Sequence, residues 1–154
     1  MTALRTATGL DEIKALAGAD LGRTDWLEIA QDRVDTFADA TGDHQWIHTD
    51  PERAANGPFG GPIAHGYLTL SLIIPLFGQL LDIQGTSMSI NYGLDKVRFP
   101  SPVKVGAKIR LHGAVESVEE VRGNGVEMRL AFTLEIEGSD KPACAAQAIY
   151  RHYA

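Results

Sequence analysis

An acid and an imidazole that could exchange protons lie in the segment Ala38–His48, where Asp43 precedes His48 by five positions. On a continuous helix, five residues turn the chain by roughly 500°, which leaves two such side chains about 140° apart. Gly42 is typical of a residue that ends a helix, and beyond it the backbone can fold back to join the pair. Together they could hold a water molecule and act as general base and general acid. Alternatively, Asp43 caps a turn and His48 is a partly buried packing residue.

A second candidate segment, Pro62–Gly66, opens the most apolar part of the chain. A helix that begins near Gly66 would present free backbone N–H groups and the positive end of its dipole. A glycine there lets a ligand approach the backbone closely, as a carbonyl oxygen that gains negative charge requires. Alternatively, Gly60, Gly61 and Gly66 only shape a tight loop. We expect this segment and Ala38–His48 to face each other across an active site.

Other charged groups are less specific in their spacing. Lys96, Arg98 and Lys104 lie in or beside a predicted strand end and could bind a phosphate-bearing ligand, or could form a solvated face. The remaining histidines show no metal-ligand spacing with Cys144 or with a carboxylate. The sequence therefore predicts no metal site.

The bulk composition is that of one ordinary globular domain spanning residues 1–154, with 44% hydrophobic and 22% charged residues. A net charge of −6 argues against a nucleic-acid-binding protein. Cys144, the single cysteine, lies among alanines and is expected in the core. With one cysteine no disulfide can form within the chain, which suits a reducing, cytoplasmic location. The apolar run Tyr67–Leu81 is too short and interrupted for a membrane span.

Helical periodicity is present in the first half of the chain. After an unstructured Met1–Thr8, it predicts a short helix at Gly9–Ala17, so residues 1–22 form an N-terminal helical decoration. A second helix is expected at Gln31–Thr41, and the residues Thr49–Glu52 are a helix-start signal.

The longest predicted helix, Ile63–Ile83, has almost no polar face and is therefore expected to be buried on most sides. Pro75 should kink this helix or split it in two, because proline has no N–H to donate.

Beyond Gly85 the apolar period changes from 3.6 to 2 residues, which indicates strands. We predict strands at Asp25–Ile29, Ser87–Tyr92, Leu94–Phe99, Lys108–Val118, Val126–Glu137 and Ala143–Tyr153, with a hairpin turn at Gly123–Gly125. Strands that follow helices favour an α+β fold, with a curved antiparallel sheet wrapped around the long apolar helix.

With these elements in place, a family resemblance becomes visible. The segment Phe37–His48, followed by Ala54-Ala55, resembles the hydratase-2 signature of MaoC-like (R)-specific enoyl-CoA hydratases, which have the hot-dog fold. The segments Pro62–Leu68 and Asn91–Pro100 are similar to later parts of the same family.

One departure from the family pattern lies between the acid and the histidine. The family usually has Asn-Pro there, whereas this chain has Gln45 and Trp46, a variant that resembles the branch related to the nodulation protein NodN. The acid and the histidine themselves are intact.

The resemblance implies a carbon–oxygen lyase of fatty acid metabolism that adds water across trans-2-enoyl-CoA to give (3R)-3-hydroxyacyl-CoA. It implies that Asp43 and His48 are the catalytic dyad, that the N–H of Gly66 donates to the thioester oxygen, and that Ser71 supports the site by hydrogen bonding. Either Asp43 or His48 could act as the base.

Four further residues complete the predicted site: His65 and Gln45 in supporting roles, and Arg98 and Tyr92 as substrate-binding residues. The resemblance also implies a homodimer with coenzyme A near the subunit interface. Because coenzyme A is part of the substrate, no separate cofactor is expected, and neither a nucleic acid nor a membrane is an expected partner.

Two other functions fit the same fold. A hot-dog acyl-CoA thioesterase would hydrolyse the thioester, but such sites typically use a lone carboxylate on the central helix, and Tyr67–Leu81 contains none. The third possibility is a non-catalytic acyl-CoA-binding module that keeps the motif without turnover.

Overall fold

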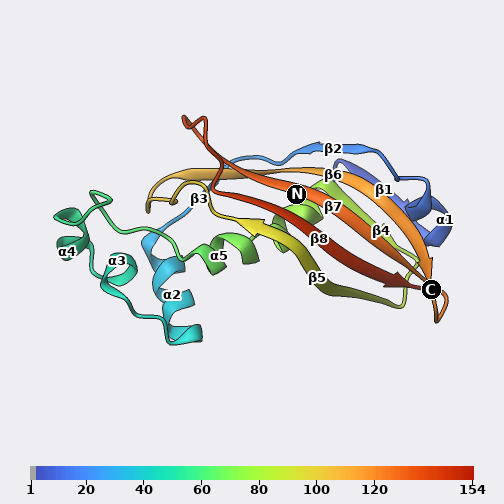
Figure 1. Cartoon of the computed structure of the whole chain (residues 1–154), viewed down its shortest axis with the longest axis horizontal. Coiled ribbons are helices and arrows are strands. Elements are labelled where there is room, and N and C mark those ends of the chain that lie inside the picture. The colour runs from blue at the N-terminus through green and yellow to red at the C-terminus, as the bar shows by residue number, and fades with distance from the viewer. Residues whose placement is uncertain (1–2) are drawn as a thin grey trace.

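The fold is a curved sheet of six strands that packs on a central helical segment (Figure 1). The computed structural model describes residues 3–154. The strands follow the spatial order β2-β6-β7-β8-β5, with β3 also paired to β6, and all the pairings within this sheet are antiparallel. Their bounds are β2 Asp20–Arg23, β3 Leu27–Glu28, β5 Met88–Arg98, β6 Lys108–Val121, β7 Gly125–Ile136 and β8 Cys144–Tyr153. The predicted antiparallel sheet around a helix, and with it the α+β fold class, is confirmed.

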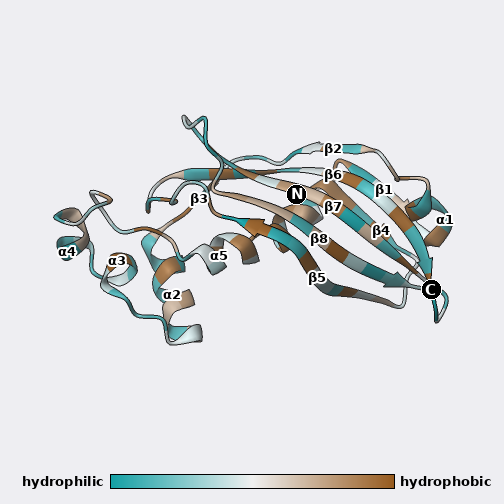
Figure 2. Cartoon of the chain, in the orientation of Figure 1, coloured by the Kyte–Doolittle hydropathy of each residue, from teal (hydrophilic) through white to brown (hydrophobic). Residues whose placement is uncertain are grey.

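Strand β7 shows how the sequence specifies the buried face. Its alternate residues Val126, Met128, Leu130, Phe132 and Leu134 are at most 2% exposed, and the alternation is visible as colour bands along the strands in Figure 2. The turn before β7 is the predicted hairpin: Val121 pairs with Gly125, and Gly123 and Asn124 between them have positive φ angles of 88° and 57°.

The two strands predicted at Ser87–Tyr92 and Leu94–Phe99 are one strand, β5. Register shifts between Asn91 and Gly93 and between Leu94 and Lys96 interrupt its pairing with β8. These irregularities interrupt the period-2 alternation, and for this reason the sequence predicts two strands where the structure has one. The first strand, predicted at Asp25–Ile29, is shorter, with only β3 (Leu27–Glu28) paired.

The central helical segment consists of α5 (Gly66–Ser71) and α6 (Ile73–Leu80), separated at Leu72. Pro75 cannot donate to the carbonyl of Ser71 four residues earlier, so the predicted split occurs one turn before the proline. The predicted helix start at Ile63 is wrong, because Ile63 forms an extended bridge with Lys104.

The predicted helix end is also wrong, because Leu81–Gln84 forms the strand β4. Its parallel partner is β1 (Arg5–Thr8), so the prediction that this part of Met1–Thr8 is unstructured is wrong as well. Met1 and Thr2 lie outside the described residues. A strand of four residues with a distant partner leaves no local period in the sequence. The short helix α1 (Gly9–Lys14) follows β1, and its residue Ile13 is fully buried.

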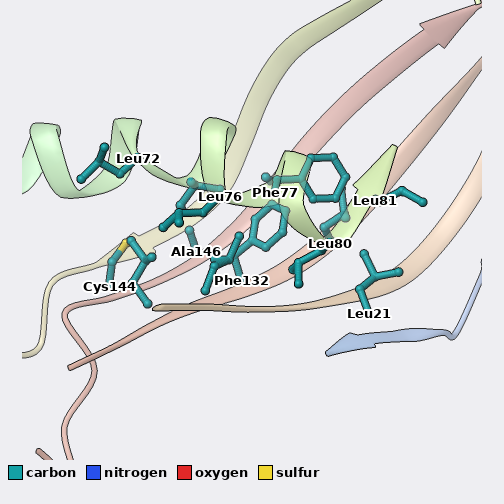
Figure 3. Close-up of a cluster of buried hydrophobic side chains, with 14 of the residues drawn as sticks. Leu21, Leu72, Leu76, Phe77, Leu80, Leu81, Phe132, Cys144 and Ala146 are labelled. Carbon is teal, nitrogen blue, oxygen red and sulfur yellow. The ribbon is translucent and has the colours of Figure 1, made fainter. Parts of the chain in front are cut away.

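The core lies between the central helices and the sheet (Figure 3). Phe77 meets Phe132 edge-on, with ring centroids 5.4 Å apart. Gly113 of β6 lies where α6 and the sheet pack closely, since a Cβ there would lie 3.0 Å from Phe132 and 3.1 Å from Leu80. Cys144 is fully buried as predicted, and burial raises the pKa of its thiol to about 11, which makes it a core residue.

Three helices lie together beyond one end of the sheet (Figure 1): α2 (Gln31–Thr41), α3 (Trp46–Thr49) and α4 (Pro51–Ala55). Helix α2 has its predicted bounds. Gly42 ends it in a left-handed conformation, with φ 81°, as predicted. Asp50 caps α4 by accepting a hydrogen bond from the backbone N–H of Arg53. Among the described helices, none has the length and apolarity that crossing a membrane requires.

Candidate active site

The two candidate segments face each other and are joined by hydrogen bonds. His48 Nδ1 lies 2.7 Å from the carbonyl oxygen of Ile63, and His65 Nε2 lies 3.0 Å from the carbonyl oxygen of Asp43. Because a carbonyl oxygen only accepts, both ring nitrogens must carry a proton and donate. The backbone N–H of Ile63 also donates to the carbonyl of Ile47 at 2.9 Å. The expectation that these segments meet is confirmed.

The local sequence explains how His48 reaches this position. After Gly42 ends α2, the Asp43 carboxylate accepts a hydrogen bond from the backbone N–H of Gln45 at 3.4 Å, and α3 begins one residue later. From α2, the amide of Gln31 donates to the His48 carbonyl at 2.8 Å. Gln31 was not predicted from the sequence, because nothing in its spacing indicates this contact.

The acid and the two histidines form a compact cluster. A carboxylate oxygen of Asp43 and ring nitrogens of His48 and His65 all lie within 4.8 Å of one another. Asp43 is exposed, whereas His48 and His65 are 7% and 3% exposed. The donor atoms of this cluster are close enough to hold a cation, and the predicted absence of a metal stays a prediction.

The buried environment favours the neutral form of His48. Burial lowers the pKa of its imidazole, and this effect outweighs the hydrogen bond to Ile63, which raises it. The neighbouring His65 lowers the His48 pKa further, and the Asp43 carboxylate raises it. With Nδ1 donating to Ile63, neutral His48 has a free lone pair on Nε2.

A cavity of about 230 Å³ brings His48 together with Gly66, the first residue of α5. The N–H of Gly66 has no carbonyl one turn earlier in its helix to bond. A Cβ at Gly66 would lie 3.4 Å from the ring of Phe99, which also lines the cavity. A ligand oxygen therefore has a narrow approach to this N–H.

Thr69 is a lining residue that sequence reasoning missed. It is 3% exposed, and its hydroxyl donates to the carbonyl of His65 at 3.3 Å. Its position three residues after Gly66 on α5 could have indicated that it shares a face with the helix start.

The other predicted site residues lie outside this cluster. Ser71 lines a separate cavity and donates its hydroxyl to the Tyr67 carbonyl at 2.7 Å. Tyr92, on β5, packs under the Arg151 guanidinium, whose central carbon lies 3.6 Å from the ring centroid. Arg98 is exposed and donates to the carbonyl of Val97. The roles predicted for Ser71, Tyr92 and Arg98 stay predictions.

The two residues that depart from the family pattern are placed by the backbone and by packing. Gln45 precedes α3, and its carbonyl accepts the N–H of His48 at 3.0 Å; its supporting role stays a prediction. Trp46 packs between the guanidinium of Arg53, 4.3 Å from its ring centroid, and Gly57, where a Cβ would meet the ring at 3.0 Å. Trp46 thus fixes α3 against α4.

A curved antiparallel sheet around a central helix, with an acid and a histidine beside the glycine that opens that helix, defines a hot-dog protein with an acid–base site. The chain belongs to the MaoC-like family: residues 12–135 match the MaoC like domain.

Three relatives illustrate this membership. The chain is 49% identical to 3-hydroxyacyl-thioester dehydratase Z of Mycobacterium tuberculosis (strain ATCC 25618 / H37Rv), over 98% of this chain and 100% of that protein. It is 42% identical to Nodulation protein N of Rhizobium leguminosarum bv. viciae, over 91% of this chain and 88% of that protein. The solved structure of the (R)-hydratase from A. caviae involved in PHA biosynthesis matches with a TM-score of 0.71 and 27% identity, over 87% of this chain and 94% of that chain.

Proposed function

We propose that this protein is an (R)-specific enoyl thioester hydratase, which interconverts a trans-2-enoyl thioester and water with a (3R)-3-hydroxyacyl thioester. The observation that carries the proposal is the cavity that holds both His48 and Gly66, with the Asp43 carboxylate within 4.8 Å of the histidine. The names of the mycobacterial dehydratase and of the A. caviae (R)-hydratase support the reaction and its stereochemistry.

Substrate activation follows from the position of Gly66. Its N–H, at the positive end of α5, donates a hydrogen bond to the thioester carbonyl oxygen. Electron withdrawal toward that oxygen leaves C3 of the conjugated double bond electrophilic. Losing one such donor typically costs about 10²–10³ in rate.

Proton transfer follows from the tautomer of His48. Because Nδ1 donates to Ile63, Nε2 is the nitrogen that can remove a proton from a water held between it and the Asp43 carboxylate. The water oxygen forms a bond to C3, and the π electrons of the C2–C3 double bond shift toward C2 and the thioester carbonyl. The proton on Nε2 is then delivered to C2. The elements of one water molecule are thus added across C2 and C3, and His48 returns to its neutral form. Dehydration is the same path reversed.

The carrier and the assembly are part of the proposal. Coenzyme A is the thiol of the substrate, and no further cofactor takes part. Several large hydrophobic residues on the central helices and on or just after β5 are 43–74% exposed: Tyr67, Ile74, Met88, Tyr92, Leu94 and Phe99. Strand β5 is an edge of the sheet, and an apolar edge of this kind suits a second copy of the chain. The enzyme is accordingly a homodimer. The predicted cytoplasmic location and role in fatty acid metabolism stay predictions.

The test is a single assay with crotonyl-CoA. Loss of the absorbance of the conjugated thioester without release of free thiol means hydration, and release of thiol means thioesterase activity. Asp43→Asn should reduce hydration by at least about 10². The matched control is Asp39→Asn, which changes an exposed aspartate at the end of α2. Binding of crotonyl-CoA without turnover by the wild-type protein would overturn the proposal in favour of a binding module.

A further inference from the structure

Three cavities follow one another along the central helices. The first, of about 230 Å³, contains Gly66 and Phe99; the second, of about 130 Å³, contains Ser71 and Asn91. The third, of about 330 Å³, shares Asn91 with the second, together with Ile74 and Tyr150. We call this third space the far cavity.

The same order holds on every element that forms the walls. Along the helices the cavities succeed one another from Gly66 through Ser71 to Phe77, and along β5 they run in the opposite direction, from Phe99 to Ser89. Strand β8 pairs with β5 and lies beside it (Figure 1), and its residues Ala148, Tyr150 and His152 line the second and third cavities. At 1.5 Å per helical residue, the distance from Gly66 to Phe77 is about 16 Å. We call this row of cavities, of which the second and third share lining residues, the groove; it leads away from the site, and it is the space that we assign to the acyl chain of a bound thioester.

The far cavity is mainly apolar, and the residues with polar side-chain atoms in its lining are Ser89, Asn91, Tyr150 and His152. The side chains of Ile74, Phe77 and Ile83 make most of its wall apolar, so burying a hydrocarbon chain there is favourable. At its end, the hydroxyl of Ser89 lies 2.8 Å from Nδ1 of His152, a residue that is 3% exposed. Nε2 of His152 is buried and has no hydrogen-bond partner among residues 3–154. Ser89 itself is exposed, so a ligand can reach its hydroxyl, while its partner His152 is held in the buried part of the wall.

The geometry of the pair defines what that ligand group must be. If His152 donates to Ser89, the serine hydroxyl is free to donate into the cavity. If Ser89 donates to His152 instead, its oxygen can only accept from a ligand. A hydroxyl group is both donor and acceptor and satisfies either arrangement, whereas a carbonyl satisfies one of them and a methyl group neither.

We propose that the far cavity binds the distal part of an acyl chain that carries a hydroxyl group remote from the thioester, and that Ser89 selects this group. The substrate class is thus a remotely hydroxylated trans-2-enoyl thioester or its 3-hydroxy counterpart. His152 is a positioning residue that holds the Ser89 side chain. This inference rests on the proposed function, because the chain enters the groove from the cavity of His48 and Gly66.

The experiment uses trans-2-enoyl-CoA esters of increasing chain length, each compared with its counterpart hydroxylated on the terminal carbon. The measured quantity is the ratio of kcat/KM for the hydroxylated ester to that for the alkyl ester. We expect this ratio to be at most one for short chains and to rise to roughly three- to tenfold at the length that reaches Ser89, as one net hydrogen bond gives.

Four variants separate selection from folding. Ser89→Ala should bring the ratio at that length to one or below, and Ser89→Thr, which retains a hydroxyl, should preserve a preference. Ser87→Ala is the matched control, since the Ser87 hydroxyl donates to the Ala154 carbonyl at 2.7 Å and not into the far cavity, and it should leave the ratio unchanged. His152→Phe should lower the ratio through KM for the hydroxylated ester alone.

The outcomes distinguish this inference from the proposed function. No hydration of crotonyl-CoA by the wild-type protein would overturn the proposed function itself. Hydration of crotonyl-CoA with a ratio near one at every length, or with a preference that survives in Ser89→Ala, would overturn only the hydroxyl selection. Rejection of all longer chains would show that the groove is filled, for example by a second copy, and would also overturn it.

Discussion

The imidazole rings of His48 and His65 are stacked, with centroids 3.9 Å apart and planes inclined by 24°. Each ring donates a hydrogen bond into the segment that bears the other: His48 to the carbonyl of Ile63, and His65 to the carbonyl of Asp43. The two bonds and the stack form a reciprocal cross-link between two segments that are separate in the sequence. Neither segment can position the site without the other.

His48→Gln should lower kcat for crotonyl-CoA hydration by about 10²–10⁴, because glutamine has no lone pair on nitrogen to accept the proton from water. Absorbance of the conjugated thioester measures the rate. The matched control is His44→Gln, since the His44 side chain is 55% exposed and lies four positions earlier. Near-normal turnover in His48→Gln would contradict the assignment of His48 as the base.

His65→Phe should lower kcat by roughly tenfold, equivalent to about 1.4 kcal/mol. Phenylalanine retains a ring against Phe37, which lies 4.8 Å away between centroids, but loses the hydrogen bond that holds Asp43. KM should change less than kcat, because the acid–base groups are displaced while the substrate cavity remains. If kcat fell in proportion to the melting temperature across a series of His65 variants, the role of His65 would be merely structural.

Gly66→Ala should reduce kcat/KM, because the added methyl group would lie 3.4 Å from the Phe99 ring and close the approach to the backbone N–H. The expected loss is up to the roughly 10²–10³ of a missing oxyanion donor. At Gly61 a Cβ would meet no atom within 4 Å, so Gly61→Ala serves as the matched control in the same steady-state assay. A Gly66→Ala enzyme as active as the control would remove Gly66 from the site.

The acid limb of the pH profile of kcat/KM should lie below pH 6.5, the ordinary value for histidine. Burial lowers the pKa of His48, so its neutral, proton-accepting form persists as the pH falls through 6.5 and is lost only at the lower folded-state value. The His44→Gln variant should show the same profile. A limb above pH 6.5 would mean that His48 is not the group whose protonation stops the reaction.

Gly113→Ala should lower the free energy of unfolding by about 1–3 kcal/mol, because the new methyl group would overpack against Phe132 and Leu80. Gly78→Ala, in α6, should instead raise it by about 0.5–1 kcal/mol, because its Cβ would meet no atom within 4 Å and alanine favours a helix. Urea unfolding followed by circular dichroism measures both. Equal stabilities of the two variants would contradict the observed packing of α6 on β6.

Features with a local signal were predictable from the sequence. Helix α2 and its cap at Gly42 follow from periodicity and from the conformational freedom of glycine, and β7 follows from a clean alternation. Asp43, His48, His65 and Gly66 were predicted, and the structure brings them together.

Features that depend on distant partners were not predictable. Strand β1 exists because β4 pairs with it, and the contact of Gln31 with the His48 carbonyl depends on how α2 and α3 pack. The Ser71 hydroxyl, expected in the site, bonds within its own helix, while Thr69, on nearly the opposite side of that helix, reaches the cavity. Which side of a two-turn helix faces a ligand depends on its rotation, which single-residue patterns do not specify.

The parallel pairing of β1 with β4 has an evolutionary consequence. Leu81 and Ile83 of β4 line the far cavity, and Arg5 and Ala7 of β1 pair with these two residues. Substitutions near the start of the chain can therefore reshape the far cavity, while the segments that carry Asp43, His48 and Gly66 remain unchanged. The far cavity and the cluster of Asp43, His48 and His65 share no residue, so the shape of one can change while the side chains of the other stay the same.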